Sequence, residues 1–135
     1  MKLSTLLNAA IEAQKQAHAP YSTKFIGSSV LWDDGTITNG CNIENASYGA
    51  TVCAERVAIW KGISENKQRK ILEIMVVSPA NPPWPPCGMC RQVMSEFATP
   101  QSLVHWSDGA SITKTKTFAE MLPETYDSRF LIPPQ

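Results

Sequence analysis

A continuous apolar run at residues 71–77, interrupted only by Glu73, constrains the fold more than any other feature of the chain. A strand that is covered on one face alternates apolar and polar residues. A run of apolar and β-branched residues is instead typical of a strand covered on both faces. We therefore expect this segment to be a strand at the centre of a sheet.

Helical and strand patterns precede this run. Apolar residues at helical spacing predict an amphipathic helix within residues 1–17. Residues 26–32 and 36–41 are predicted to form a hairpin, because Gly35 between them tolerates a positive φ.

A second helix is predicted over residues 53–62. Its apolar face is expected to carry Cys53, Val57 and Trp60, which share one side of a helix. Gly62 is suited to ending this helix.

The segment that follows the apolar run is rich in proline. Each proline in residues 81–86 fixes φ and removes a backbone donor, so we expect a stiff loop that leads to Cys87. A helix, two strands around a turn, and a short helix with a capping box are predicted beyond it. The helix is predicted from the apolar residues Val93, Met94 and Phe97. The two strands are expected at 103–106 and 110–115 around a turn at 107–109, and Thr117 with Glu120 forms the capping box of the short helix.

This order of elements predicts an α/β fold, a three-layer α/β/α arrangement with a mixed sheet. The 135 residues lie within the usual size of one compact domain, so a single domain over residues 1–135 is expected. Hydrophobic residues make up 43% and charged residues 18%, a globular composition that is neither disordered nor membrane-spanning.

The charge balance and the N-terminal sequence limit which binding partners and which cellular compartment we expect. Twelve basic and twelve acidic side chains cancel, which argues against nucleic acid as the main substrate. The N-terminal segment lacks a long apolar run and a small-residue cleavage site, so we expect no export signal and a cytoplasmic protein. Thiols stay reduced there, and clustered cysteines more often bind metal or act in catalysis than form disulfides.

Two cysteine segments form the strongest functional pattern. Cys53 and the pair Cys87 and Cys90 each lie near a predicted helix start, where the helix dipole stabilises a thiolate. A Cys-x-x-Cys pair can span one edge of a tetrahedral zinc site. A third thiolate from Cys53 would leave one position open for water, as in catalytic zinc sites.

Two charged residues follow the first cysteine. Glu55 is placed to take a proton from the attacking water and to deliver it to the substrate. Arg56 could donate to the sulfurs and draw off the excess negative charge of three thiolates on one zinc ion. Alternatively, Arg56 is a solvated surface residue.

Each fragment also has a simpler interpretation. The Cys-x-x-Cys pair alone is compatible with a redox pair, and Cys53 alone with an ordinary core residue. Cys41 as a fourth ligand would close the site into a structural zinc module. A structural site gives no reason for Glu55, however, and the combined pattern is the three-cysteine form of the zinc deaminase signature.

Nearly the whole chain resembles the small homotetrameric cytidine deaminases of nucleoside salvage. The resemblance rests on residues 19–22, 40–48, 52–56, 86–92 and 121–123. It implies a cytidine deaminase-like fold, a pyrimidine nucleoside as substrate, and one Zn²⁺ per chain on Cys53, Cys87 and Cys90. It also implies that Glu55 is the proton shuttle and that Cys41 is a free buried thiol.

The resemblance further implies residues that hold the nucleoside. Asn42 and Glu44 correspond to the residues that hold the ribose, and Ala54 to a backbone amide that contacts the base carbonyl. Without the neighbouring metal motif, Asn42 and Glu44 would be interpreted as surface turn residues. Tyr48 and Tyr126 are expected near the site of a neighbouring subunit.

The chain departs from the family in two places. The aromatic residue that stacks on the base falls on Lys24, with Phe25 one place later, and in a strand that shift reverses the face. Either a bulge returns Phe25 to the pocket or the usual aromatic wall is missing. Trp84, in the proline-rich loop, either lines the pocket mouth or packs on the prolines.

Three other functions compete with nucleoside salvage. The first is deamination of a modified cytosine nucleoside or of a cytosine antibiotic such as blasticidin S. The second is editing of cytosine in nucleic acid, against which the zero net charge argues. The third is a structural zinc module without catalysis.

Overall fold

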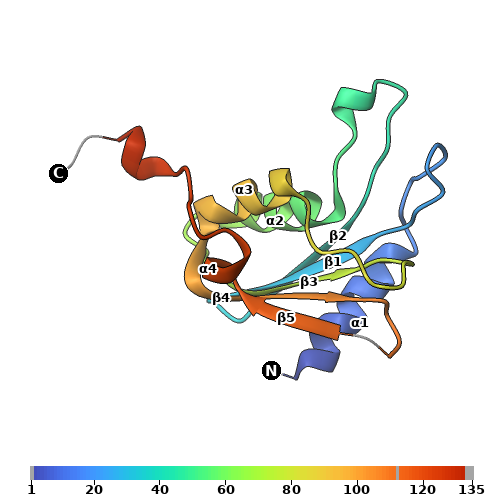
Figure 1. Ribbon diagram of the computed structural model, residues 1–135, viewed down its shortest axis with the longest axis horizontal. Coiled ribbons are helices and arrows are strands. Elements are labelled where there is room, and N and C mark those ends of the chain that lie inside the picture. The colour runs from blue at the N-terminus through green and yellow to red at the C-terminus, as the bar shows by residue number, and fades with distance from the viewer. Residues whose placement is uncertain (1, 112, 133–135) are drawn as a thin grey trace.

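A five-stranded sheet forms the centre of the computed structural model, which describes residues 2–111 and 113–132 (Figure 1). The strands lie in the order β2-β1-β3-β4-β5, with β3 central as predicted. β3 pairs in parallel with β4, and the other neighbours are antiparallel, which confirms the mixed sheet. The strands are β1 (Gly27–Trp32), β2 (Ile37–Cys41), β3 (Ile71–Val77), β4 (Ala98–Ser107) and β5 (Thr113–Thr117).

Some predicted segments reach beyond the described residues. Position 112 of the expected strand 110–115, position 1 of the expected first helix, and positions 133–135 of the expected domain lie outside them. The last strand is shifted toward the C-terminus relative to the prediction, since β5 begins at Thr113 and continues to the capping residue Thr117.

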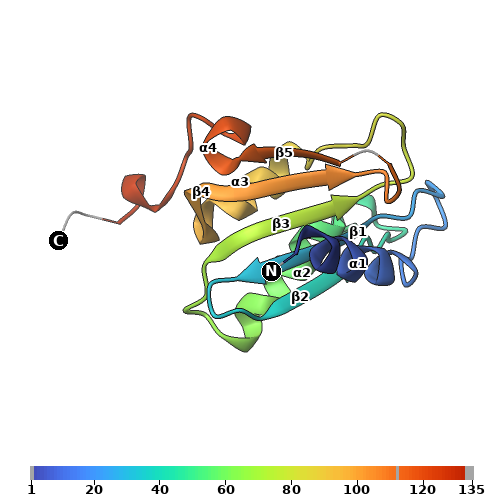
Figure 2. The ribbon, with the colours of Figure 1, turned by 90° about the horizontal axis from the view of Figure 1, so that it is seen from below.

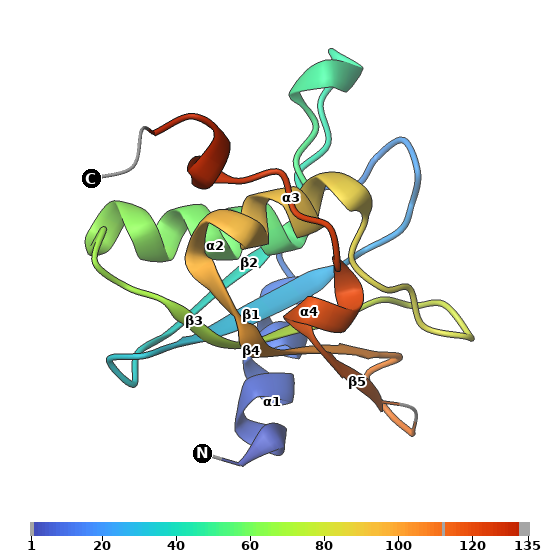
Figure 3. The ribbon, with the colours of Figure 1, turned by 60° about the vertical axis from the view of Figure 1, so that its left-hand side comes forward.

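Helices cover both faces of the sheet, which confirms the three layers. α1 (Leu3–Gln14) packs on one face, and α2 (Ala54–Glu65) with α3 (Gly88–Phe97) packs on the other (Figures 2 and 3). α4 (Phe118–Met121) starts with the predicted capping box, and short 3-10 helices occur at Tyr48–Ala50 and Ser128–Phe130. Among the described residues, no helix has the length and apolar character needed to cross a bilayer.

Alternating side chains of β1 and β3 enter two separate cores. Val30 and Ile74 belong to the core beneath α2 and α3, whereas Leu31 and Met75 belong to the core beneath α1. The polar exception in the central run, Glu73, is explained by a neighbouring strand. Its Oε1 lies 2.8 Å from Nε2 of the buried His105 on β4.

The buried face of α2 differs from the prediction. Trp60 is 48% exposed, and Gly62 lies inside the helix, which continues to Glu65. The buried residues of α2 are Ala54, Glu55, Ala58, Ile59 and Gly62.

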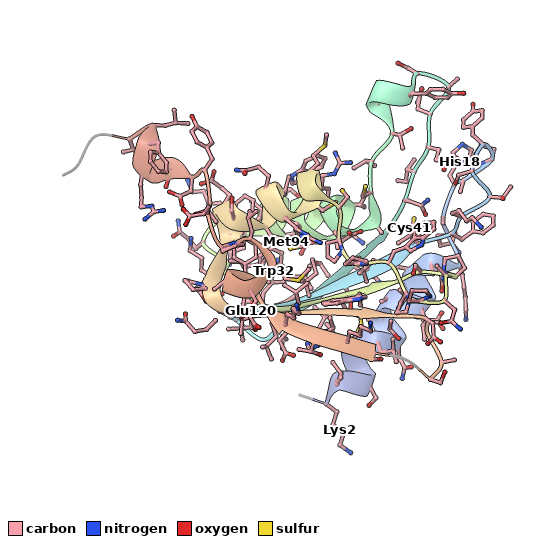
Figure 4. The ribbon with its side chains drawn as sticks, viewed as in Figure 1. Lys2, His18, Trp32, Cys41, Met94 and Glu120 are labelled. Carbon is pink, nitrogen blue, oxygen red and sulfur yellow. The ribbon has the colours of Figure 1, made fainter. Side chains whose placement is uncertain are left out.

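Close packing against Trp32 explains this difference. Trp32 is fully buried and lies between the sheet and the helices, as does Met94 (Figure 4). A Cβ atom on Gly62 would lie 2.3 Å from Cζ2 of Trp32. Gly62 is therefore required by the approach of α2 to the sheet, and the bulky Trp60 is excluded from this side.

We expect Gly62→Ala to lower the free energy of unfolding by about 2 kcal/mol, because an overpacked core must shift neighbouring atoms. Gly49→Ala is the matched control, since no atom lies within 4 Å of its added Cβ and its φ is not positive. Chemical denaturation of both variants measures the difference. Equal stability of the two variants would contradict the packing argument.

Candidate metal centre and cavity

Two helix starts bring three cysteines together. Cys53 is the N-cap residue of α2 and Cys87 is the N-cap residue of α3, as the sequence predicted, and Cys90 lies in the first turn of α3. The three Sγ atoms all lie within 4.8 Å of one another, and those of Cys53 and Cys87 are 3.8 Å apart. Sulfurs that are 34 residues apart in the chain thus form one cluster.

Cys41 lies outside this cluster. It is the last residue of β2, and its thiol is free as expected but only partly buried. In the described part of the chain, the only group of metal-ligating side chains is that of Cys53, Cys87 and Cys90. The geometry therefore does not support a closed site with Cys41 as fourth ligand.

The charge of the sulfur cluster suits a metal ion. A hydrogen bond with Cys90, assisted by Arg56, lowers the pKa of Cys53 to about 5. The same hydrogen bond, together with burial, raises the pKa of Cys90. A cation that replaces the shared proton would be held by three thiolates, the soft ligands that zinc prefers. Three protein ligands also match the number found in catalytic zinc sites.

Arg56 contacts the cluster directly. Its Nη2 donates to Sγ of Cys53 at 3.4 Å, and its guanidinium lies 5.8 Å from the ring centroid of Trp60. Arg56 is thus held between a sulfur atom and an aromatic face, and the interpretation as a solvated surface residue is wrong. Its positive charge offsets part of the negative charge of the thiolates.

Glu55 lies in the first turn of α2 and is buried, with 4% of its surface exposed. Burial raises the pKa of its carboxyl to about 7, and the charge of Cys53 acts in the same direction. A group with a pKa near neutrality can both accept and donate a proton at the usual working pH. This is the property required of a proton shuttle.

A cavity of about 300 Å³ opens beside the cluster. Strand register explains its position, because Gly27 pairs with both Cys41 and Val77. The segments that flank these three residues therefore leave the sheet at the same end (Figures 1 and 2). The described lining residues are Ser22, Lys24, Ile26, Asn42, Glu44, Thr51, Val52, Cys53, Ala54, Glu55, Val76, Ser78, Trp84, Pro85 and Cys87.

Asn42 stabilises one wall of this cavity through two hydrogen bonds to the backbone. Its Oδ1 accepts from the backbone N–H of Ile26 at 2.9 Å, and its Nδ2 donates to the carbonyl of Lys24 at 2.7 Å. A primary amide has further donor and acceptor capacity, so Asn42 can also bind a hydroxyl in the cavity.

Glu44 stabilises the segment around Tyr21 and Ser22, which precedes this wall in the chain. Its carboxylate accepts from the backbone N–H groups of Tyr21 and Ser22, at 3.0 and 3.1 Å, and from the Ser22 hydroxyl. These bonds lower the pKa of Glu44, chiefly through the Ser22 hydroxyl. Both Asn42 and Glu44 are therefore structural clamps, and the interpretation as simple surface turn residues is wrong.

The aromatic residues that the family resemblance suggested do not line this cavity. Lys24 and Ile26 line it, whereas Phe25 between them is 45% exposed and lies outside, so no bulge returns its ring. Tyr48 is 78% exposed on an arm, residues 44–52, that stands away from the layers (Figures 1 and 3). Tyr126 is 58% exposed and stacks on Phe130, with the ring centroids 5.7 Å apart.

The sequence reasoning missed Arg91. Its Nε donates to the carbonyl of Pro86 at 2.9 Å, and its Nη1 donates to the carbonyl of Met121 at 3.2 Å. Arg91 thereby ties the residue before Cys87 to the end of α4. Its place directly after Cys90 was the available signal, but the distant partners were not visible in the sequence.

Comparison with known proteins agrees with this geometry. Residues 1–105 match the model of the cytidine and deoxycytidylate deaminase zinc-binding region. The chain belongs to this family. It is 40% identical to a cytidine deaminase of Halalkalibacterium halodurans over 93% of the chain and 95% of that protein. It is 37% identical to a cytidine deaminase of Sporosarcina psychrophila over 97% of the chain and 96% of that protein.

Solved structures of the family share the fold. A cytidine deaminase from Burkholderia pseudomallei superposes with a TM-score of 0.87 at 35% identity, covering 93% of this chain and all of that one. A cytidine deaminase from Mycobacterium tuberculosis gives 0.78 at 29% identity, covering 94% of this chain and 98% of that one. The zinc-binding family model and the cluster of three thiols together identify zinc as the cofactor of this family member.

We expect zinc analysis of single Cys→Ser variants to separate ligands from the remaining cysteine. The wild type and Cys41→Ser should retain about one zinc per chain, whereas Cys53→Ser, Cys87→Ser and Cys90→Ser should lose it, because each removes one of three thiolates. Retention of zinc by Cys87→Ser, or loss in Cys41→Ser alone, would contradict the ligand assignment.

Proposed function

We propose that the chain hydrolyses cytidine or deoxycytidine, or both, to uridine or deoxyuridine and ammonia. The observation that carries this proposal is the buried carboxyl of Glu55 beside three clustered thiols, with both opening into one cavity. The activity named for the relatives at 40% and 37% identity supports the same reaction.

The chemistry follows from the groups that meet at this point. Zinc on Cys53, Cys87 and Cys90 would lower the pKa of a water molecule beside Glu55 and so supply a nucleophile. Glu55 accepts a proton from the attacking water and passes it to the ring nitrogen of the base. It then takes the second proton, from the hydroxyl that the water has added to the ring carbon, and passes it to the amino group. The bond between that carbon and the amine breaks, so that one water is consumed and ammonia is released.

Other residues hold the nucleoside. Asn42 and Glu44 offer their remaining hydrogen-bonding capacity to the sugar hydroxyls, and the backbone N–H of Ala54 donates to the base carbonyl. All three residues line the cavity. Arg56 keeps the charge of the sulfur cluster low through its contact with Cys53.

We expect Glu55→Gln to retain zinc but to lose deamination by about 10²-fold or more, because only proton transfer is removed. Glu96→Gln, on the exposed side of α3, is the matched control and should keep normal turnover. Ammonia release and bound zinc are measured in parallel. Near-normal turnover by zinc-loaded Glu55→Gln would rule out this residue as the shuttle.

The alternative is a modified cytosine nucleoside or a cytosine antibiotic of the blasticidin S type. The observation that favours it is Lys24 on the cavity wall, whose side-chain ammonium has no hydrogen-bond or ion-pair partner among the described residues. Cytidine, deoxycytidine, adenosine and blasticidin S should be compared by ultraviolet absorbance and ammonia release. Preferred turnover of blasticidin S would replace cytidine as the proposed substrate.

We further propose that the protein is a single-domain, cytoplasmic homotetramer that acts on free nucleosides. The projecting arm with exposed Tyr48, and exposed Tyr126 and Phe130 near the C-terminus, support an assembly in which these rings meet other subunits. Clustered reduced thiols fit the cytoplasm. The zero net charge favours a nucleoside over nucleic acid.

Light scattering measures the assembly directly. The active species should have four times the chain mass of 14.9 kDa, and Tyr48→Ala should lower activity per chain if Tyr48 completes a neighbouring site. A fully active species at the mass of one chain would contradict shared sites.

A further inference from the structure

The cavity contains a single aromatic wall residue. Among the described residues that line it, Trp84 alone carries an aromatic ring. Trp84 comes from the loop between β3 and α3, which lies at the same end of the sheet as residues 18–26 (Figures 1 and 2). A flat heterocycle that enters this cavity therefore has one ring on which to stack.

The loop holds Trp84 in place. The backbone N–H of Trp84 donates to Oγ of Ser78 at 2.9 Å. Prolines flank the residue on both sides, and Pro83 and Pro86 are buried while Trp84 between them is 45% exposed. The backbone of Trp84 is therefore already placed at the cavity wall before a ligand arrives, so little backbone conformational entropy is lost on binding.

Within the part of the chain that the structure describes, the indole of Trp84 has no hydrogen-bond or ring partner. None of the ring–ring or cation–ring contacts of the described residues involves Trp84, and its Nε1 donates no hydrogen bond among them. A tryptophan that is buried in the packing of a loop usually finds a hydrogen-bond partner for its N–H. An exposed indole on a cavity wall, without such partners among the described residues, is instead suited to contact a ligand.

We propose that Trp84 is the surface on which the pyrimidine ring of the substrate stacks, and that it determines the preference of this site for flat bases. This inference rests on the proposed function, because it concerns the same cavity. It also accounts for the absence of Phe25 from the wall, since the aromatic contact comes from a different loop.

Two nucleosides that differ in flatness provide the decisive test. Uridine has a flat ring, whereas the ring of 5,6-dihydrouridine is saturated and puckered and cannot stack. Calorimetric titration of the zinc-loaded protein with each compound gives a ratio of dissociation constants without requiring turnover. Wild type should prefer uridine by about five-fold, the size of one ring–ring contact.

The variants are Trp84→Leu, Trp84→Phe and Phe25→Leu. Trp84→Leu should abolish the preference for uridine and raise KM for cytidine about five-fold with little change in kcat. Trp84→Phe should keep most of both properties, and Phe25→Leu should change neither by more than about two-fold. Trp84→Met replaces Trp84→Leu if the latter loses zinc or unfolds at a lower temperature.

Three outcomes are distinguishable. An unchanged uridine preference in Trp84→Leu, or a larger loss in Phe25→Leu, would overturn the role of Trp84 while leaving the deaminase activity intact. Uridine binding without any deamination of cytidine by wild type would overturn the proposed function, and the binding ratio would still decide the role of Trp84. Failure of wild type to bind uridine would overturn both.

Discussion

The meeting of two helix starts at one group of sulfur atoms is the constraint on which the rest of the site depends. Two N-termini that point at the same place concentrate positive potential there, which favours thiolates over thiols. Cys53 caps one helix and Cys87 the other, so any movement of α2 relative to α3 separates the ligands. The packing of both helices is therefore part of the metal site.

Small residues determine how closely α2 approaches the sheet. A Cβ on Gly40 would lie 2.7 Å from the backbone nitrogen of Ala58, and Gly62 faces Trp32 in the same way. These two close approaches place the start of α2, and with it the buried Glu55, at the end of the sheet where the cavity lies. Arg91 secures the other helix by binding the carbonyl that precedes Cys87.

Local features were predictable from the sequence, and partners distant in sequence were not. The cysteine spacing, the central strand and the capping box of Thr117 each depend on neighbouring residues, and the structure bears them out. The exposure of Trp60 and the burial of Gly62 depend on Trp32, about thirty residues earlier in the chain. Likewise, no local pattern reveals that Asn42 bonds the backbone around residue 25 or that Phe25 faces outward.

Asn42 has both a structural role and a proposed binding role, which limits how the residues that line this cavity can change in evolution. The amide that we propose binds a sugar hydroxyl also bonds the backbone on either side of Phe25, and so fixes which side chains form the wall. Under this proposal, sugar recognition and the shape of the cavity wall are linked through Asn42. Selection for a different sugar would have to begin elsewhere, for example at Thr51 or Val52, because any replacement of Asn42 also releases the wall.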